Sequence, residues 1–110
     1  MMESKQKQQL MNNTKWEEIR IAIYSCPYNV QWRTKDLESG YISTWDGEWY
    51  YHFKEREYIT IEWLEIKVDA GEIRDEVIII LRNIHVPGVV SDKVIRVYGY
   101  VEVGSFMDYL

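Results

Sequence analysis

Length, composition and charge limit what this chain can be. It has 110 residues, 46% of them hydrophobic, and 18 acidic against 13 basic residues give a net charge of −5. The length fits one domain with one hydrophobic core. Double-stranded nucleic acid is bound through clustered Lys and Arg, so the scattered basic residues and the acidic balance argue against that partner. Aromatic residues reach 15%, mostly Tyr and Trp, which suit half-buried positions and interfaces.

The N-terminus and the single cysteine indicate where the chain works. Residues 1–12 are rich in Gln and Lys and lack periodicity, so we predict a flexible polar tail there and a single domain over residues 13–110. The tail has no apolar segment typical of a signal peptide. No run of about 18 apolar residues could span a membrane. Cys26 stands alone, which excludes an intrachain disulfide and indicates a reducing compartment. We expect a cytoplasmic protein that makes no membrane contact.

A first helix is predicted after the tail. Thr14 and Glu17 have the spacing of a capping box, and an apolar stripe that includes Trp16 follows with helical periodicity. Because Pro27 disfavours helical geometry at the residue before it, the helix should end near Ser25.

Period-two patterns follow and predict a hairpin. Residues 30–34 alternate as a short strand, and Asp46-Gly47 between residues 41–45 and 48–53 indicates a two-residue type I′ turn. That turn fixes the cross-strand register and hence the two faces. The inner face would carry Ile42, Thr44, Trp49, Tyr51 and Phe53. The outer face would carry Tyr41, Ser43, Trp45, Glu48, Tyr50 and His52.

The second half of the chain completes the sheet. A loop over residues 54–58 would pair Phe53 with Ile59 in a third hairpin strand, and the apolar parity reverses after Trp63, which indicates a bulge or a new covering partner. Apolar spacing over residues 73–84 predicts a second helix, although its β-branched centre would also suit a buried strand. Residues 94–101 form the last strand. The predicted fold class is α+β, in the order α-β-β-β-β-α-β: an antiparallel sheet of four to five strands with two helices on one face.

The sequence contains no catalytic or metal-binding constellation that we recognise. Cys26 lies on the apolar stripe of the first predicted helix, so we expect a buried structural thiol and not a nucleophile. His52 and His85 are far apart and have no ligand-spaced partner, so a zinc site built from them and carboxylates is the less favoured alternative. Glu62 and Glu65 should point to opposite faces of a strand. We therefore predict no catalytic residue, no cofactor and no metal.

One surface is a candidate for binding. The outer face of the predicted hairpin gathers aromatic side chains with a polar rim, a composition typical of interfaces. Cross-strand stabilisation of an exposed sheet face is the competing explanation. The candidate interaction surface consists of Arg33, Tyr41, Trp45, Glu48, Tyr50, His52 and Glu62.

Several stretches together resemble a known family. They are Asn13-Thr14-Lys15-Trp16, Trp32-Arg33-Thr34-Lys35, Trp45-Asp46-Gly47-Glu48-Trp49, Ile61-Glu62-Trp63-Leu64-Glu65-Ile66 and Val94-Ile95-Arg96-Val97-Tyr98-Gly99-Tyr100. Across residues 13–100 the chain resembles a small bacterial family of single-domain proteins of unknown function. The resemblance implies a bacterial cytoplasmic protein and brings no activity, cofactor or catalytic residue. In size and character the chain is also similar to the immunity partners of bacterial toxins.

These observations lead to a main hypothesis and its alternatives. The main one is a non-enzymatic module that binds an unidentified protein partner, in its specific form a toxin-neutralising immunity protein. The alternative is a binder of a small ligand or of single-stranded nucleic acid that stacks on the same aromatic rings. A hydrolase or transferase is the third. We also expect that the same face, or a free sheet edge, could form a symmetric homodimer.

Overall fold

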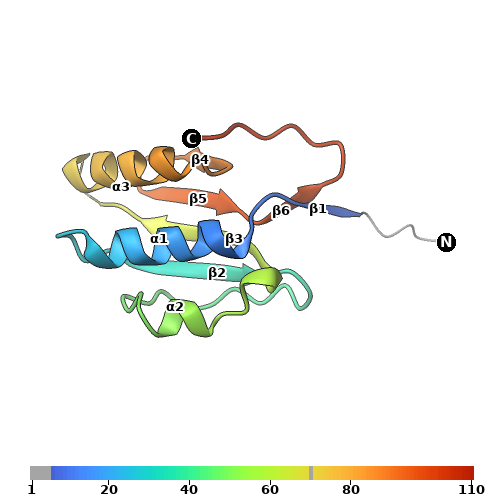
Figure 1. The fold of residues 1–110 in the computed structure, drawn as a ribbon, viewed down its shortest axis with the longest axis horizontal. Helices are drawn as coiled ribbons and strands as arrows, with labels where there is room; N and C mark the ends of the chain where they lie inside the picture. Colours follow the sequence, from blue (N-terminus) through green and yellow to red (C-terminus); the bar gives the residue numbers. More distant parts are fainter. Residues whose placement is uncertain (1–5, 70) are drawn as a thin grey trace.

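A four-stranded antiparallel sheet forms the centre of the computed structural model, which describes residues 6–69 and 71–110 (Figure 1). In spatial order its strands are β2 (Trp32–Asp36), β3 (Ile61–Lys67), β5 (Val94–Tyr98) and β4 (Gly88–Val90). The main helices are α1 (Asn13–Ser25) and α3 (Gly71–Ile84). A short helix α2 (His52–Glu55) and a 3-10 turn η1 (Tyr58–Thr60) lead into β3. The predicted α+β class is confirmed.

The strand register separates an apolar face from a charged one. Opposite Trp32 of β2 stands Ile66 of β3, which in turn pairs with Ile95 of β5. All three are fully buried. Because successive side chains of a strand alternate between faces, the residues next to them in sequence point the other way. The sheet therefore has one face for the core and one face made of Arg33, Glu65, Arg96 and their neighbours.

Both main helices cover the apolar face. Trp16, Ile19 and Ile23 of α1 and Val77 and Leu81 of α3 are buried in the same cluster as the inward strand residues. Phe53 of α2 joins this cluster and is fully buried, 5.2 Å from the rings of both Trp32 and Trp49. Burying each large apolar side chain contributes about 1.5–3 kcal/mol, so this cluster is the main source of stability.

The helix boundaries follow from local chemistry. The predicted end of α1 is confirmed, since Cys26 before Pro27 is extended. The start lies earlier than the predicted Thr14 cap, because Asn12 is the N-cap and its side chain accepts a hydrogen bond from the Lys15 N–H at 2.8 Å. Residues 71–84 form a helix and not the alternative strand. The sequence Asp69-Ala70-Gly71-Glu72 before this helix has the pattern of a second capping box, but residue 70 lies outside the described residues.

The predicted hairpin turn at Asp46-Gly47 is wrong. The chain reverses after β2 through Gly40, whose φ is +74°, and residues 41–46 run back antiparallel to β2 with bridges at Ile42 and Asp46. Gly47 is not in the left-handed region that a type I′ turn needs. Two carboxylates explain why the predicted turn does not form. Asp46 accepts a hydrogen bond from the N–H of Glu48, and Glu48 accepts hydrogen bonds from three backbone N–H groups at the start of α2. These local bonds stabilise a turn and a helix in place of a strand.

The hairpin faces change accordingly. Trp49 and Phe53 are buried as predicted, but Ile42, at 44% exposure, and Tyr51, at 68%, lie at the surface. Ser43, expected on the outer side, is 6% exposed, and its hydroxyl accepts the backbone N–H of Thr34 at 3.0 Å. The pairing of Phe53 with Ile59 does not form, since Phe53 belongs to α2.

Two further expectations are corrected at the strand ends. Within the predicted tail, β1 (Lys7–Gln9) pairs with β6 (Tyr100–Glu102), and Met11 is 3% exposed in the core. Residues 1–5 of that tail lie outside the described residues. The expected irregularity in β3 is present but lies one step earlier, since Ile61 and Trp63 face Asp36 and Lys35 with Glu62 as the extra residue. None of the helices in the described segments is long and apolar enough to cross a membrane.

Candidate functional site

A charged rung crosses the middle of the sheet face that carries no helix. Arg33, Glu65 and Arg96 lie opposite one another on β2, β3 and β5. One carboxylate oxygen of Glu65 accepts the Arg33 Nε–H at 2.8 Å, and the other accepts Arg96 at 3.0 Å from Nε and 2.6 Å from Nη2. Glu65 is 5% exposed, whereas the arginine side chains are 34% and 36% exposed. A buried carboxylate therefore holds two half-exposed guanidinium groups in fixed positions.

Aromatic rings lie beneath these cations. The Arg33 guanidinium is 4.6 Å from the centre of the Trp45 ring, and the Lys67 ammonium is 5.5 Å from the same ring. Arg96 lies 4.3 Å from the ring of Trp63. Both distances for arginine are within the range of cation–π attraction, so the aromatic side chains and the carboxylate fix the guanidinium groups from two sides.

We call this surface the outer sheet face. It consists of Arg33, Lys35, Trp45, Glu62, Trp63, Glu65, Lys67, Val89, Val94, Arg96 and Tyr98. Glu62 lies at its margin, 3.6 Å from Lys35 and 4.0 Å from Lys7. The face has more basic than acidic side chains, in a chain whose net charge is −5. The outer sheet face is therefore a locally positive surface on an acidic protein. Such a surface attracts acidic groups.

Arg33 has donors to spare. Its Nε–H is used by Glu65, and among the described residues neither of its Nη groups has a hydrogen-bond acceptor. A guanidinium with a free pair of Nη donors matches a carboxylate in geometry and charge. Sequence analysis included Arg33 in the candidate surface, and the structure places it in the charged rung of the outer sheet face, opposite Glu65.

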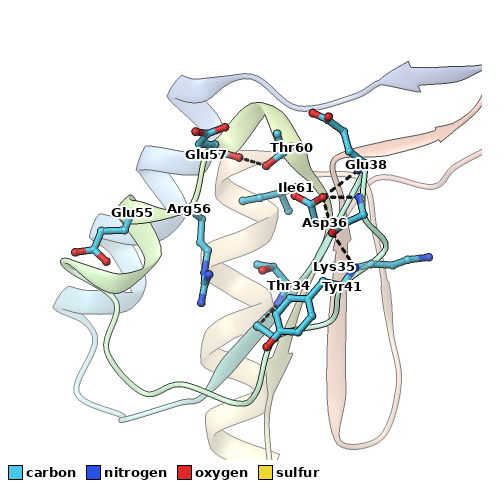
Figure 2. Close-up of a pocket in the computed structure, with 12 residues that line it drawn as sticks. Thr34, Lys35, Asp36, Glu38, Tyr41, Glu55, Arg56, Glu57, Thr60 and Ile61 are labelled. Carbon is cyan, nitrogen blue, oxygen red and sulfur yellow. Dashed lines mark hydrogen bonds between the residues drawn. The ribbon is translucent and has the colours of Figure 1, made fainter.

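A polar cleft of about 570 Å³ lies between the turn after β2 and the segment from α2 to η1 (Figure 2). Tyr41 lines it, together with Arg56 and several acidic side chains that include Asp36. The Asp36 carboxylate accepts the N–H and the hydroxyl of Ser39 at 2.7 and 2.9 Å. These hydrogen bonds lower the pKa of Asp36. The carboxylate is therefore committed to the turn and is a poor candidate for catalysis.

An Asp–His pair stands at the start of α2. His52 Nδ1 is 2.9 Å from the Asp46 carboxylate, and this hydrogen bond, followed by the Asp46 charge, raises the pKa of His52. A catalytic triad would also need a nucleophile at the other ring nitrogen. No hydroxyl or thiol in the described part of the chain bonds to that nitrogen. Glu48 serves the backbone of the same turn.

A buried arginine links α1 to the turn before α2. Arg20 is 4% exposed; its Nη1 donates to the Tyr50 carbonyl at 2.6 Å, and its Nη2 to Glu17 at 2.9 Å. The Tyr58 hydroxyl also donates to Glu17 at 2.7 Å. Burial, followed by this bond, raises the pKa of Tyr58. Sequence analysis missed Arg20, although Glu17 and Arg20 have the three-residue spacing of a helical ion pair.

The seven predicted surface residues are thus divided among separate places. Arg33 and Trp45 are together on the outer sheet face, with Glu62 at its margin. Tyr41 lines the cleft, Glu48 and His52 belong to the turn into α2, and Tyr50 lies beside α1. Sequence analysis did not include Trp63, Glu65, Lys67, Arg96 and Tyr98. The signal that could have found them is a charged residue in the middle of an apolar strand, as in Leu64-Glu65-Ile66 and Ile95-Arg96-Val97.

Comparison with protein families gives one match. A family model described as "Family of unknown function (DUF6678)" matches residues 1–104. The chain belongs to this family. The match confirms the family of unknown function that sequence analysis predicted, and it extends beyond residues 13–100 at both ends. Neither the curated proteins nor the solved structures contain a match to the chain.

Membership of the family assigns no site, so the chemistry rests on the residues themselves. In residues 6–69 and 71–110, no group of three or more His, Cys, Asp or Glu side chains could hold a metal ion. Cys26 is half-buried and its thiol donates to the Tyr28 carbonyl at 3.4 Å. Of the surfaces described, the outer sheet face alone combines fixed cations, aromatic rings and spare donors.

Proposed function

We propose that this chain is a non-enzymatic module that binds a protein partner through its outer sheet face. The observation that carries this proposal is the state of Arg33. Glu65 holds its Nε, the Trp45 ring supports its plane at 4.6 Å, and both Nη groups remain for an acceptor from outside. Arg and Trp dominate binding hot spots because they combine large contact areas with directional bonds. A carboxylate of the partner is the acceptor that fits.

The same geometry disfavours the nucleic-acid alternative. A base stacks on a free ring face, but on this surface Arg33 and Lys67 lie over Trp45, and Arg96 lies over Trp63. The Trp63 side chain is also only 6% exposed. Retention of a single-stranded thymidine oligonucleotide on a filter at low salt would favour that alternative over a protein partner.

The experiment identifies the partner by its contact with the surface. A photo-crosslinking amino acid at Lys35 on the outer sheet face should capture a partner from the native host, and the same amino acid at Arg82 on α3 should not. Affinity for the purified partner should fall at least about tenfold in Arg33→Lys, since lysine cannot offer a planar pair of donors. Arg82→Lys is the matched control. Equal affinity of Arg33→Lys, Trp45→Ala and the unmodified chain would contradict the assigned surface.

Within this class we propose the specific role of a toxin-neutralising immunity protein in a bacterial cytoplasm. The small size and the acidic balance support this role. Co-expression of the chain with its captured partner tests it: rescue of host growth is expected, together with loss of rescue in Arg33→Lys. A partner without toxicity would contradict the immunity role while leaving the binding function in place.

A further inference from the structure

A groove runs between α1 and α3 on the side of the helices that faces away from the sheet. The two helices are antiparallel (Figure 1), and Lys15 in the first turn of α1 donates to the carbonyl of His85 just after α3. The groove has a volume of about 640 Å³. Its floor is apolar and consists of Ile21 and Ala22 from α1 and Ile80 and Ile84 from α3. Ile21 and Ala22 are distinct from the α1 stripe that faces the core, whereas Ile80 and Ile84 also pack against the core cluster.

The apolar surface continues beyond the groove. Ile21 is 44% exposed, and Tyr24, one turn further along α1, is 57% exposed. The Tyr24 ring centre is 5.0 Å from that of Tyr50, which in turn is 4.9 Å from that of Tyr51. Helices of globular domains usually turn one apolar stripe to the core and polar residues to water. The helix α1 instead presents apolar side chains on both sides, so its outward side is suited to a second contact.

Carboxylates border the groove. Glu17 and Glu18 line it on α1, and Glu76 is not part of the lining but lies one turn before Ile80 on α3. Arg20 neutralises Glu17, whereas no cation of the described residues lies within ion-pair distance of Glu18 or Glu76. No Lys or Arg lines the groove. Basic groups that flank an apolar stripe would therefore complement the carboxylates beside the groove.

We propose that this groove binds an amphipathic helix of a partner protein, with an apolar stripe flanked by Lys or Arg. Two antiparallel helices leave a furrow into which the side-chain ridges of a third helix pack. The small Ala22 side chain at the floor permits close approach. A helix in an apolar groove is a common mode of peptide recognition. A second copy of this chain fits less well, because pairing the two grooves would bring carboxylate borders together.

A defined probe tests the groove without knowledge of the partner. The probe is a fluorescent 18-residue helical peptide of Leu, Lys and Ala with Leu in one stripe, and a peptide of the same composition in scrambled order is its control. Fluorescence anisotropy should give a dissociation constant below 100 μM for the first peptide only. Backbone amide shifts in NMR spectra should change along α1 and α3 and stay unchanged on the outer sheet face.

Matched variants separate the groove from general attraction to an acidic protein. Ile21→Ser should weaken binding at least fivefold, whereas Ile42→Ser, at the same 44% exposure in the segment after β2, should not. Glu18→Lys should weaken binding more than Glu38→Lys, which changes the net charge equally. Equal affinity of the two serine variants, no binding of the peptide, or shifts confined to the outer sheet face would overturn the proposal. A dimer that Ile21→Ser dissociates would also overturn it and assign the groove to a second copy. None of these outcomes depends on Arg33 or Trp45.

Discussion

Removal of the Glu65 carboxylate tests the charged rung directly. Glu65→Ala deletes three charge-assisted hydrogen bonds of 2.8, 3.0 and 2.6 Å and leaves two neighbouring guanidinium groups without their shared anion. Breaking a fully buried pair costs about 3–5 kcal/mol. Because about a third of each arginine side chain is exposed, water can replace part of what is lost. We therefore expect the free energy of unfolding to fall by about 2 kcal/mol.

Urea denaturation followed by tryptophan fluorescence measures this loss, and Glu62→Ala provides the control on the same strand. Glu62 pairs with lysines at 3.6 and 4.0 Å, and half-exposed pairs of this kind contribute less than about 1 kcal/mol. Glu65→Gln, which keeps one acceptor, should lie between the two. If Glu65→Ala unfolds within 0.5 kcal/mol of the unmodified chain (roughly the error of such measurements), or if Glu62→Ala is the more damaging, the carboxylate does not organise this face.

Three further predictions concern the strand end and the turn before α2. Gly99→Ala should destabilise the fold by about 3 kcal/mol in urea denaturation, because a Cβ there would clash with the Ile61 carbonyl oxygen. Gly47→Ala should stay within about 0.5 kcal/mol of the unmodified chain, since the atom nearest to its new Cβ would be 3.6 Å away. If Gly47→Ala destabilised the fold more than Gly99→Ala, a type I′ turn at Asp46-Gly47 would be favoured again. The pKa of His52 is raised by its hydrogen bond to Asp46, so the pair stabilises the fold below about pH 6.5 and this contribution is lost as the pH rises through the raised pKa. NMR titration of the His52 ring should show a lower midpoint in Asp46→Asn, and an unchanged midpoint would contradict the pairing.

The sequence could predict the elements whose signal is local. Helical spacing identified α1 and α3, and Pro27 identified where α1 ends. Alternation identified β2, β3 and β5, because each has a side facing the core. The same logic failed for β1, whose side chains are exposed. Its strand geometry comes from pairing with β6, a partner more than 90 positions away, and no periodic pattern records such pairing.

The hairpin error has a different physical origin. An Asp-Gly pair favours a tight turn through backbone conformation, but here Asp46 and Glu48 use their carboxylates to bind nearby N–H groups. Side-chain bonds of this kind compete with strand pairing. The actual reversal at Gly40 has no flanking alternation strong enough to reveal it. As a consequence the prediction placed Ser43 on the outer side, although it is buried. The predicted burial of Trp49 was correct, because its size favours burial in any register.

The candidate site was only partly predictable for a related reason. The proximity of Arg33 to Trp45 depends on neighbouring segments, and both residues were in the predicted surface. The contact of Glu65 with Arg96 depends on β3 lying beside β5, and strand order is a property of the whole fold. A sequence pattern can say that Glu65 and Arg96 interrupt apolar strands, but only the sheet order says that they meet.

The charged rung is also informative because apolar side chains could serve the fold in its place. Well-packed apolar side chains in place of a buried ion network often leave stability unchanged or increase it, so stability alone is a weak explanation for Arg33, Glu65 and Arg96. Protection of the sheet face from aggregation would require charge there, but lysines would provide it as well as arginines. Lysine would not provide a planar group fixed at Nε by a buried carboxylate, with Nη donors that no described residue uses. Fixed orientation of a side chain lowers the entropic cost of binding a partner with matching geometry, which is why we propose that this face binds.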